Sequence, residues 1–340
     1  MLRKLSTRKA YAWVTPLLIA VLALAYVRGL FVPLMHNDSA HHANIAVHMV
    51  NTGDYCSLVD RGTDYLDKPH FLFWSAAFWF NLLGVTPLSY KLTSFLFSLL
   101  ALVATYKLAR LLYNRRTAVA SVVVLATSFA FALGNNDVRM DAILTACIIV
   151  ASWQLILLFE RFHWTSLLIS AAALATGFST KGMIGVVIPC TALFFHVLQH
   201  RGWRGLLAWQ WPVVAALTLL FIIPVLYCYH LQFDLHPEKI IRGSSGHSGV
   251  KFILLGQSVE RFQGERWGDT AKNNYFFFIG TFAWAFLPWS LLAFSAWWRR
   301  LKHMLKYDFK DRSLEAVTFC TTTAVLRAVF VLGVQVAALY

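Results

Sequence analysis

Five ionisable side chains stand at the edges of apolar segments, where a charged group has few structural uses. They are Asp38, Asp67, Lys68, Asp141 and Lys181. Such a set could transfer a sugar from a sugar phosphate, because the phosphate leaves as a stable anion. The reaction then needs cations for the phosphate and one base for the acceptor. Hydrolysis of a glycoside would need two carboxylates, since its leaving group must be protonated. The set therefore favours an anionic, lipid-linked substrate.

Most of these residues also have a structural interpretation. Asp38 and Asp141 could each cap the helix that follows them. Asp67 and Pro69 suit the start of a helix, where proline is favoured in the first turn. Lys68 has no such explanation, and a lysine at a helix start could bind a phosphate there.

Lys181 lies between two apolar runs with almost no loop around it. A lysine near hydrocarbon costs up to about 2.5–3.5 kcal/mol at the centre of a span and less at its edge. We therefore expect an anionic partner, which could be Asp137, Asp141 or a ligand phosphate. The alternative is a side chain that reaches the outer interface.

Four histidines lie within or just before a helix that the apolar spacing predicts over 39–50. Imidazole binds zinc and similar ions, so a divalent metal is one alternative for this cluster. Their spacing does not identify a metal site, and the metal requirement stays open. The residues are His36, His41, His42 and His48.

The cysteines predict no disulfide. Only Cys56 lies in a polar segment, and the other four stand in apolar runs, where a free thiol behaves as a small hydrophobe. These four are Cys147, Cys190, Cys228 and Cys320.

The composition predicts a membrane protein. Of the 340 residues, 58% are hydrophobic and 14% charged, against about 45–50% and about 25% in soluble domains. This excludes disorder and argues against an ordinary soluble enzyme. The net charge of +14 falls in short clusters between apolar runs, which indicates membrane topology rather than a nucleic-acid partner.

The expected fold is an all-α polytopic membrane protein with about nine transmembrane helices. A span needs about 20 apolar residues, and the candidates are about 10–34, 89–112, 117–134, 142–159, 164–180, 183–198, 206–229, 276–298 and 315–339. The segment 71–83 is short, and we expect an interfacial or re-entrant helix there. With that assignment, the short basic connections all fall on the cytoplasmic side with the basic N-terminus.

This topology makes residues 1–340 a single transmembrane domain with outward-facing loops at about 35–88 and 230–275. It places Asp38, Lys68, Asp141 and Lys181 on the outer face. Juxtamembrane helices are expected in the first of these loops.

In this order, the motifs resemble one family: the polyprenyl-phosphate-sugar-dependent membrane glycosyltransferases of the C superfamily, which include aminoarabinose lipid A transferases and protein mannosyltransferases. The matching pieces are Asp38 after the first span, Tyr65-Leu66-Asp67-Lys68-Pro69, Asp141, Thr180-Lys181-Gly182, Glu260-Arg261-Phe262 and Leu287-Pro288-Trp289.

The resemblance implies a polyprenyl-phosphate sugar donor and a lipid, lipid A-like, or other envelope glycan or protein acceptor. Transfer would occur on the periplasmic face of a bacterial inner membrane. Asp38 and Asp141 would be catalytic, and Lys68, Lys181 and Arg261 would bind the donor phosphate. Asp67, Pro69 and Glu260 would support the site.

The chain departs from the family pattern at several positions. Ser39, His70 and Ser258 replace residues that relatives commonly have, and the C-terminal part of the family pattern is missing after Tyr340. Two other functions are therefore weighed. One is an inactive, C-terminally truncated homologue that binds lipid or a partner. The other is a lipid or anion transporter, for which repeat symmetry and ionisable residues deep in spans would be expected.

Overall fold

The computed structural model describes residues 14–35, 37–138, 140–241, 245–259, 265–266, 269–270 and 277–303. Within them the chain is mostly helical, as predicted, with two short antiparallel hairpins. The helices are α2 (Val14–Gly29), α3 (Asn37–Thr52), α4 (Phe71–Leu83), α5 (Pro87–Leu112), α6 (Arg115–Ala126), α7 (Phe129–Asn136), α8 (Met140–Glu160), α9 (Trp164–Lys181), α10 (Ile184–Arg201), α11 (Gln210–Tyr229), α12 (Gly249–Lys251), α14 (Phe277–Ala285) and α15 (Ser290–His303). A 3-10 turn covers Trp203–Leu207, and π-helical turns cover His230–Asp234 and Phe252–Gly256. The hairpins pair β1 (Val59–Asp60) with β2 (Thr63–Asp64) and β3 (Glu265–Arg266) with β4 (Asp269–Thr270).

Four helices of the described chain are long and apolar enough to cross a membrane, namely α5, α8, α10 and α11 with the turn that continues it. The pair α6 and α7, bent by 56°, makes a fifth if it is one broken span. These five coincide with predicted spans, and the chain is a multi-pass membrane protein. At the other predicted spans, α2 has 16 residues, α9 is less apolar, and α14 and α15 are separate helices. The segment 315–339 lies outside the described residues, so the count of nine stays a prediction.

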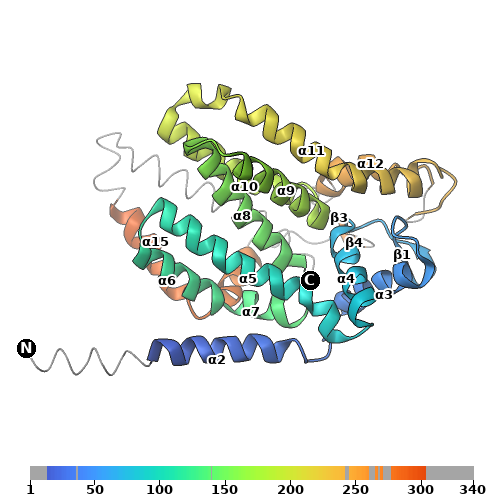
Figure 1. Ribbon diagram of the computed structural model, residues 1–340, viewed down its shortest axis with the longest axis horizontal. Helices are drawn as coiled ribbons and strands as arrows, with labels where there is room; N and C mark the ends of the chain where they lie inside the picture. Colours follow the sequence, from blue (N-terminus) through green and yellow to red (C-terminus); the bar gives the residue numbers. More distant parts are fainter. Residues whose placement is uncertain are drawn as a thin grey trace, which may run out of the picture.

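The long helices pack around α8, which contacts α5, α9 and α10 (Figure 1). The helices α9 and α10 approach each other closely at Gly177 and Gly185. A Cβ atom on Gly185 would lie 2.3 Å from a backbone carbon of Gly177. No side chain fits at that distance, so glycine at this position sets the spacing of the two helices.

Local polar contacts fix where two of the helices begin and end. Thr86 starts α5, because its side chain accepts from the backbone N–H of Ser89 while the Ser89 side chain accepts from that of Thr86. On the next turn, the buried Lys91 Nζ donates to the carbonyl oxygens of Gly29 at 3.0 Å and Val32 at 2.6 Å. Those carbonyls lie at and just after the end of α2, where carbonyl groups have no partner within the helix.

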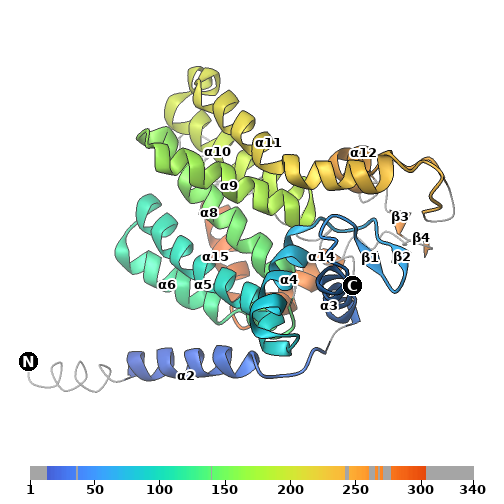
Figure 2. The same cartoon turned by 45° about the vertical axis from the view of Figure 1, so that its right-hand side comes forward.

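Two helices and a hairpin gather at one end of the long helices, beside α12 (Figures 1 and 2). We call the described residues of 35–83, which contain α3, β1, β2 and α4, the α3–α4 cap. The helix predicted over 39–50 is α3, and the short helix predicted over 71–83 is α4. With 13 residues, α4 is too short to span a bilayer. The cap therefore has the helices that the sequence predicts for the first loop.

Candidate active site

Lys181 forms an ion pair with Asp141. The Nζ–Oδ1 distance is 2.7 Å, and the contact joins the last residue of α9 to the second residue of α8. The side chain of Lys181 is only 3% exposed, whereas that of Asp141 is 32% exposed. A buried ammonium group must be paired, so the prediction of an anionic partner is confirmed, and the partner is Asp141. The exposed part of this carboxylate can still meet a ligand.

A second ion pair joins neighbours in the sequence. Lys68 Nζ lies 2.9 Å from Asp67 Oδ2, with the lysine largely buried and the carboxylate 43% exposed. The hydroxyl group of Tyr229, at the end of α11, donates to the Lys68 carbonyl oxygen at 3.1 Å. Pro69 is buried directly before α4. The end of α11 and the start of α4 therefore hold the Lys68 segment in place.

His42, on α3, is affected by the charges of both lysines. Burial and the charge of Lys68 lower the pKa of His42 to about 3, and the charge of Lys181 acts in the same direction. The His42 Nε2 atom lies 3.3 Å from the Tyr65 hydroxyl oxygen, which donates weakly to Asp67 at 3.5 Å. Burial, followed by the charge of Asp67, raises the pKa of Tyr65. Two lysines from distant parts of the sequence thus act on one neutral, buried imidazole.

Asp38 is the second residue of α3 and is half-buried. It lies near Tyr65, because its negative charge contributes to the raised pKa of that phenol. The next residue, Ser39, donates from its hydroxyl group to the carbonyl oxygen of Asp137 at 3.3 Å. The carboxylate of Asp137 accepts from the backbone N–H of Met35 at 3.0 Å. The start of α3 is therefore anchored to the connection that leads into α8.

Gln257 is a buried residue that the sequence analysis did not select. Its side-chain amide donates to the carbonyl oxygen of Asp67. Its Oε1 atom lies where a Cβ atom on Gly182 would approach within 2.5 Å. It therefore joins the Lys68 segment to the turn after Lys181. The only sequence signal is an amide that follows the apolar stretch 252–255 after one glycine.

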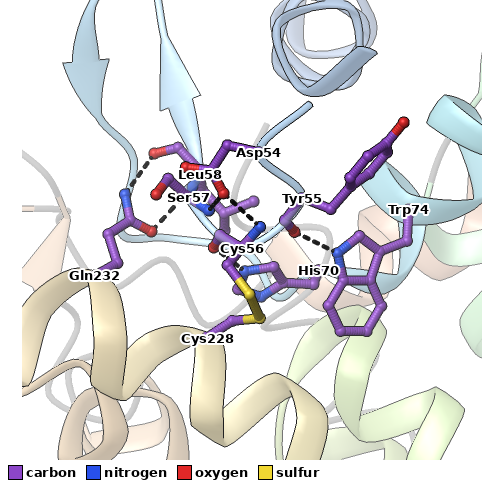
Figure 3. Close-up of a disulfide and its surroundings, with 9 residues drawn as sticks. All are labelled: Asp54, Tyr55, Cys56, Ser57, Leu58, His70, Trp74, Cys228 and Gln232. Carbon is purple, nitrogen blue, oxygen red and sulfur yellow. Dashed lines mark hydrogen bonds between the residues drawn. A yellow bond between two sulfur atoms is a disulfide. The ribbon is translucent and has the colours of Figure 1, made fainter. Parts of the chain in front are cut away.

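A disulfide joins Cys56 in the cap to Cys228 in α11, with Cα atoms 4.7 Å apart (Figure 3). The prediction of no disulfide is therefore wrong. It failed because Cys228 was assigned to the hydrophobic interior of its span, whereas it stands one residue before the end of α11, beside the cap. Gln232 strengthens the same connection, since its amide exchanges two hydrogen bonds of 2.9 Å with the backbone of Leu58.

His70 lies against the disulfide and is completely buried (Figure 3). Its Nε2–H donates to the Cys56 carbonyl oxygen at 2.8 Å, and its ring packs edge-on against Tyr229. Burial lowers the pKa of His70 to about 4. Next to it, Trp74 donates from its indole to the carbonyl oxygen of Tyr55 at 2.6 Å. His70 therefore serves the packing of the cap.

Two predicted site residues, Glu260 and Arg261, lie outside the described residues, and their roles stay predictions. Among the described residues, no three His, Cys, Asp or Glu side chains are grouped so that they could hold a metal ion. Of the clustered histidines, His41 contacts Asp60 at 2.7 Å. His42 contacts Tyr65 and is affected by the charges of the two lysines. His36 is not among the described residues.

The comparisons with known proteins agree with the motifs. Residues 67–228 match the family described as dolichyl-phosphate-mannose-protein mannosyltransferase. An undecaprenyl phosphate-alpha-4-amino-4-deoxy-L-arabinose arabinosyl transferase of Pseudomonas paraeruginosa is 26% identical over 277 residues, which cover 79% of this chain and 46% of that protein. A relative with the same description from Aeromonas salmonicida is 25% identical, with 84% and 49% covered. The chain thus spans about half the length of the curated relatives that it matches.

The fold matches a solved structure. ArnT from Cupriavidus metallidurans, crystallised bound to undecaprenyl phosphate, superposes with a TM-score of 0.73 at 19% identity. The superposition covers 96% of this chain and 56% of the other. The resemblance predicted from the motifs is confirmed. The chain is similar in sequence and fold to the polyprenyl-phosphate-sugar-dependent membrane glycosyltransferases of the C superfamily.

Proposed function

We propose that the chain transfers a sugar from a polyprenyl-phosphate donor to a lipid A-like lipid or another envelope acceptor. The observation that carries the proposal is that two lysines from distant parts of the sequence, Lys68 and Lys181, lie close enough to the buried His42 for their charges to lower its pKa. Each lysine is paired with a carboxylate that is partly exposed. Such a pair can turn its ammonium group toward a phosphate without a large rearrangement. The names of the relatives support undecaprenyl phosphate as the carrier lipid.

The two lysines and, by resemblance, Arg261 bind the donor phosphate in this proposal. The bond from the sugar to the phosphate oxygen breaks while the acceptor oxygen bonds to the sugar carbon. The bonding electrons stay on the phosphate, which becomes a monoester with one more negative charge. Fixed cations stabilise that charge as it develops.

Asp38 is the proposed base or acceptor-orienting carboxylate, and Asp141 is the second acid of the site. Asp38 follows the first span and acts on Tyr65 beside the Lys68 segment. Asp67 and Pro69 position Lys68, and Glu260 supports Arg261 by resemblance. No step of this scheme requires a divalent metal.

We also propose the nine-span topology over residues 1–340, with the site facing the periplasm of a bacterial inner membrane. The disulfide supports this orientation of the cap, because disulfides persist in oxidising compartments such as the periplasm. The basic connections at the other ends of the spans support it as well.

Transfer from a labelled undecaprenyl-phosphate sugar, in membranes with an endogenous acceptor, tests the proposal. We expect Asp38→Asn to abolish transfer while the protein stays folded. Asp54→Asn is the matched control, because Asp54 is exposed in the same cap and its Oδ1 atom accepts from the backbone N–H groups of Cys56 and Ser57 in a turn. Normal turnover by Asp38→Asn would overturn the role of that carboxylate. Donor binding without transfer by the wild type would favour the inactive homologue, and donor movement across the membrane would favour the transporter.

A further inference from the structure

His42 combines burial with contacts that lead to Lys68. Its side chain is packed against Tyr65 and Phe73, with ring centroids 6.3 and 5.6 Å away. The Nε2 atom contacts the Tyr65 hydroxyl group at 3.3 Å, the hydroxyl group contacts Asp67 at 3.5 Å, and Asp67 pairs with Lys68 at 2.9 Å. This polar chain connects the imidazole to the first of the two cations.

Both lysines near His42 already have a carboxylate partner before a ligand arrives. Lys68 is paired with Asp67, and Lys181 with Asp141. A phosphate that binds to these two lysines therefore adds negative charge beside two carboxylates. Added negative charge in a buried region is costly unless a proton enters as well.

We propose that His42 takes up a proton when a phosphate monoester binds at Lys68 and Lys181, and so acts as a positioning residue for the leaving phosphate. The inference rests on the donor-phosphate site of the proposed function. The donor is a phosphodiester with one negative charge, and the product is a monoester with two. A protonated imidazole would stabilise the product phosphate more than the donor phosphate.

The size of the effect distinguishes the two phosphates. A unit charge about 5 Å away, at an effective dielectric constant of about 20, changes the pKa of a group by about 2. Each added negative charge raises the pKa of His42 from its lowered value, so a dianionic monoester raises it further than a diester does. We expect the imidazole to be charged near pH 6 beside the monoester and neutral beside the diester.

The other groups that act on His42 come from three elements. They are His41 on α3, Asp67 and Lys68 on the segment before α4, and Lys181 on α9, with the Tyr65 hydroxyl group in direct contact. Burial, followed by the charges of Lys68, Lys181 and His41, holds the imidazole neutral in the free protein, and Asp67 opposes them. A bound dianion adds to the effect of Asp67 and favours the charged imidazole.

Calorimetry of farnesyl phosphate binding at pH 6, in two buffers of different ionisation enthalpy, measures the protons taken up by the full chain in detergent. We expect the wild type to take up about one proton more than His42→Gln, which keeps a polar side chain beside Tyr65. His48→Gln, on the same helix, should behave as the wild type. The diester farnesyl methyl phosphate should show no such difference between variants.

Equal proton uptake by the wild type and His42→Gln, with binding intact, would overturn the inference and leave the proposed function standing. If the wild type binds neither phosphate, the donor site itself is wrong and both proposals fall. If His42→Gln does not fold, the sign of the net proton uptake by the wild type decides between the outcomes. The monoester, with a second pKa near 6, can only lose protons to cations, so net uptake supports the inference and net release overturns it.

Discussion

The α3–α4 cap and the helical bundle beside it both have an apolar core, but the cap adds many polar links to it. In the cap, hydrogen bonds, ion pairs and a disulfide join segments that are far apart in the sequence. In the bundle, α8, α9, α10 and α11 pack through apolar side chains and close glycine contacts. Polar contacts have direction, so they fix individual side chains, whereas apolar packing fixes whole helices. The comparison indicates that the bundle supplies a rigid support on which the cap positions charged groups.

Two buried lysines, Lys91 outside the site and Lys181 within it, differ in the kind of partner that they have. Lys91 is fully buried and donates to backbone carbonyls at the end of α2. Lys181 is almost as buried, but its partner, Asp141, is a carboxylate that is one-third exposed. A cation bonded to backbone oxygens joins two helices, and a cation beside an accessible carboxylate can also meet a ligand. Burial alone therefore does not identify a functional lysine.

The largest effect should come from the bundle. We expect Gly185→Val to prevent folding, because its Cβ would lie 2.3 Å from the backbone of Gly177 and no rotamer can relieve a clash with backbone. Fluorescence-detected size-exclusion chromatography in detergent measures the folded fraction. Gly134→Ala is the control, since a Cβ there meets only the Cβ of Ala142, at 4.0 Å. A folded Gly185→Val protein of wild-type stability would show that α9 and α10 do not need this close approach.

The second largest effect concerns the Lys181–Asp141 ion pair, which lies where the bundle meets the cap. Asp141→Asn leaves the buried Lys181 without a counter-charge and should cost about 3 kcal/mol. Lys181→Met leaves a carboxylate that is 32% exposed, which water can solvate, and should cost about 1 kcal/mol. Thermal unfolding in detergent should rank the two in that order.

The double variant should be more stable than Asp141→Asn alone, because it removes the unpaired charge. Equal losses for the two single variants would mean that solvent reaches Lys181 as easily as it reaches Asp141. In that case the ion pair would not mark the edge of the buried region.

The elements of both regions could be predicted where a local rule applies. The 13 residues of α4 form an apolar run of limited length, and the partner of Lys181 follows from the cost of an unpaired lysine near hydrocarbon. The contacts of the cap could not be predicted, because they depend on how distant segments meet. Cys56 and Cys228 are 172 residues apart, and no spacing rule connects them. The neighbouring histidines of α3 have different partners, since His41 contacts Asp60 and His42 contacts Tyr65. A count of histidines in the sequence cannot show this difference.

The third effect concerns the covalent part of the cap. Cys56→Ser removes the disulfide and should lower the free energy of unfolding by about 2–4 kcal/mol. Cys190→Ser, which replaces a free and partly buried cysteine in α10, should change stability much less. Alkylation of the unfolded wild type should label two more cysteines after reduction than before. Equal labelling would contradict the disulfide and remove its support for a periplasmic cap.

The smallest effect is a dependence of stability on pH that originates in the cap. Burial lowers the pKa of His70 to about 4, below the value of about 6.5 in an unfolded chain. Between these values the unfolded state binds more protons, so stability falls as the pH falls from about 6.5 toward about 4, by up to about 1.4 kcal/mol per pH unit. Above pH 7 the effect is absent.

At pH 5 this amounts to about 2 kcal/mol, which unfolding by denaturant at pH 7.5 and pH 5 can measure. His70→Gln should lose part of the acid sensitivity, because glutamine can still donate to the Cys56 carbonyl oxygen but does not titrate. Lys91→Met is the control outside the cap, because it lowers stability without changing that slope. An unchanged slope in His70→Gln would show that His70 is not the source of the acid sensitivity and would leave it to other groups with lowered pKa values, such as His42 and Asp54.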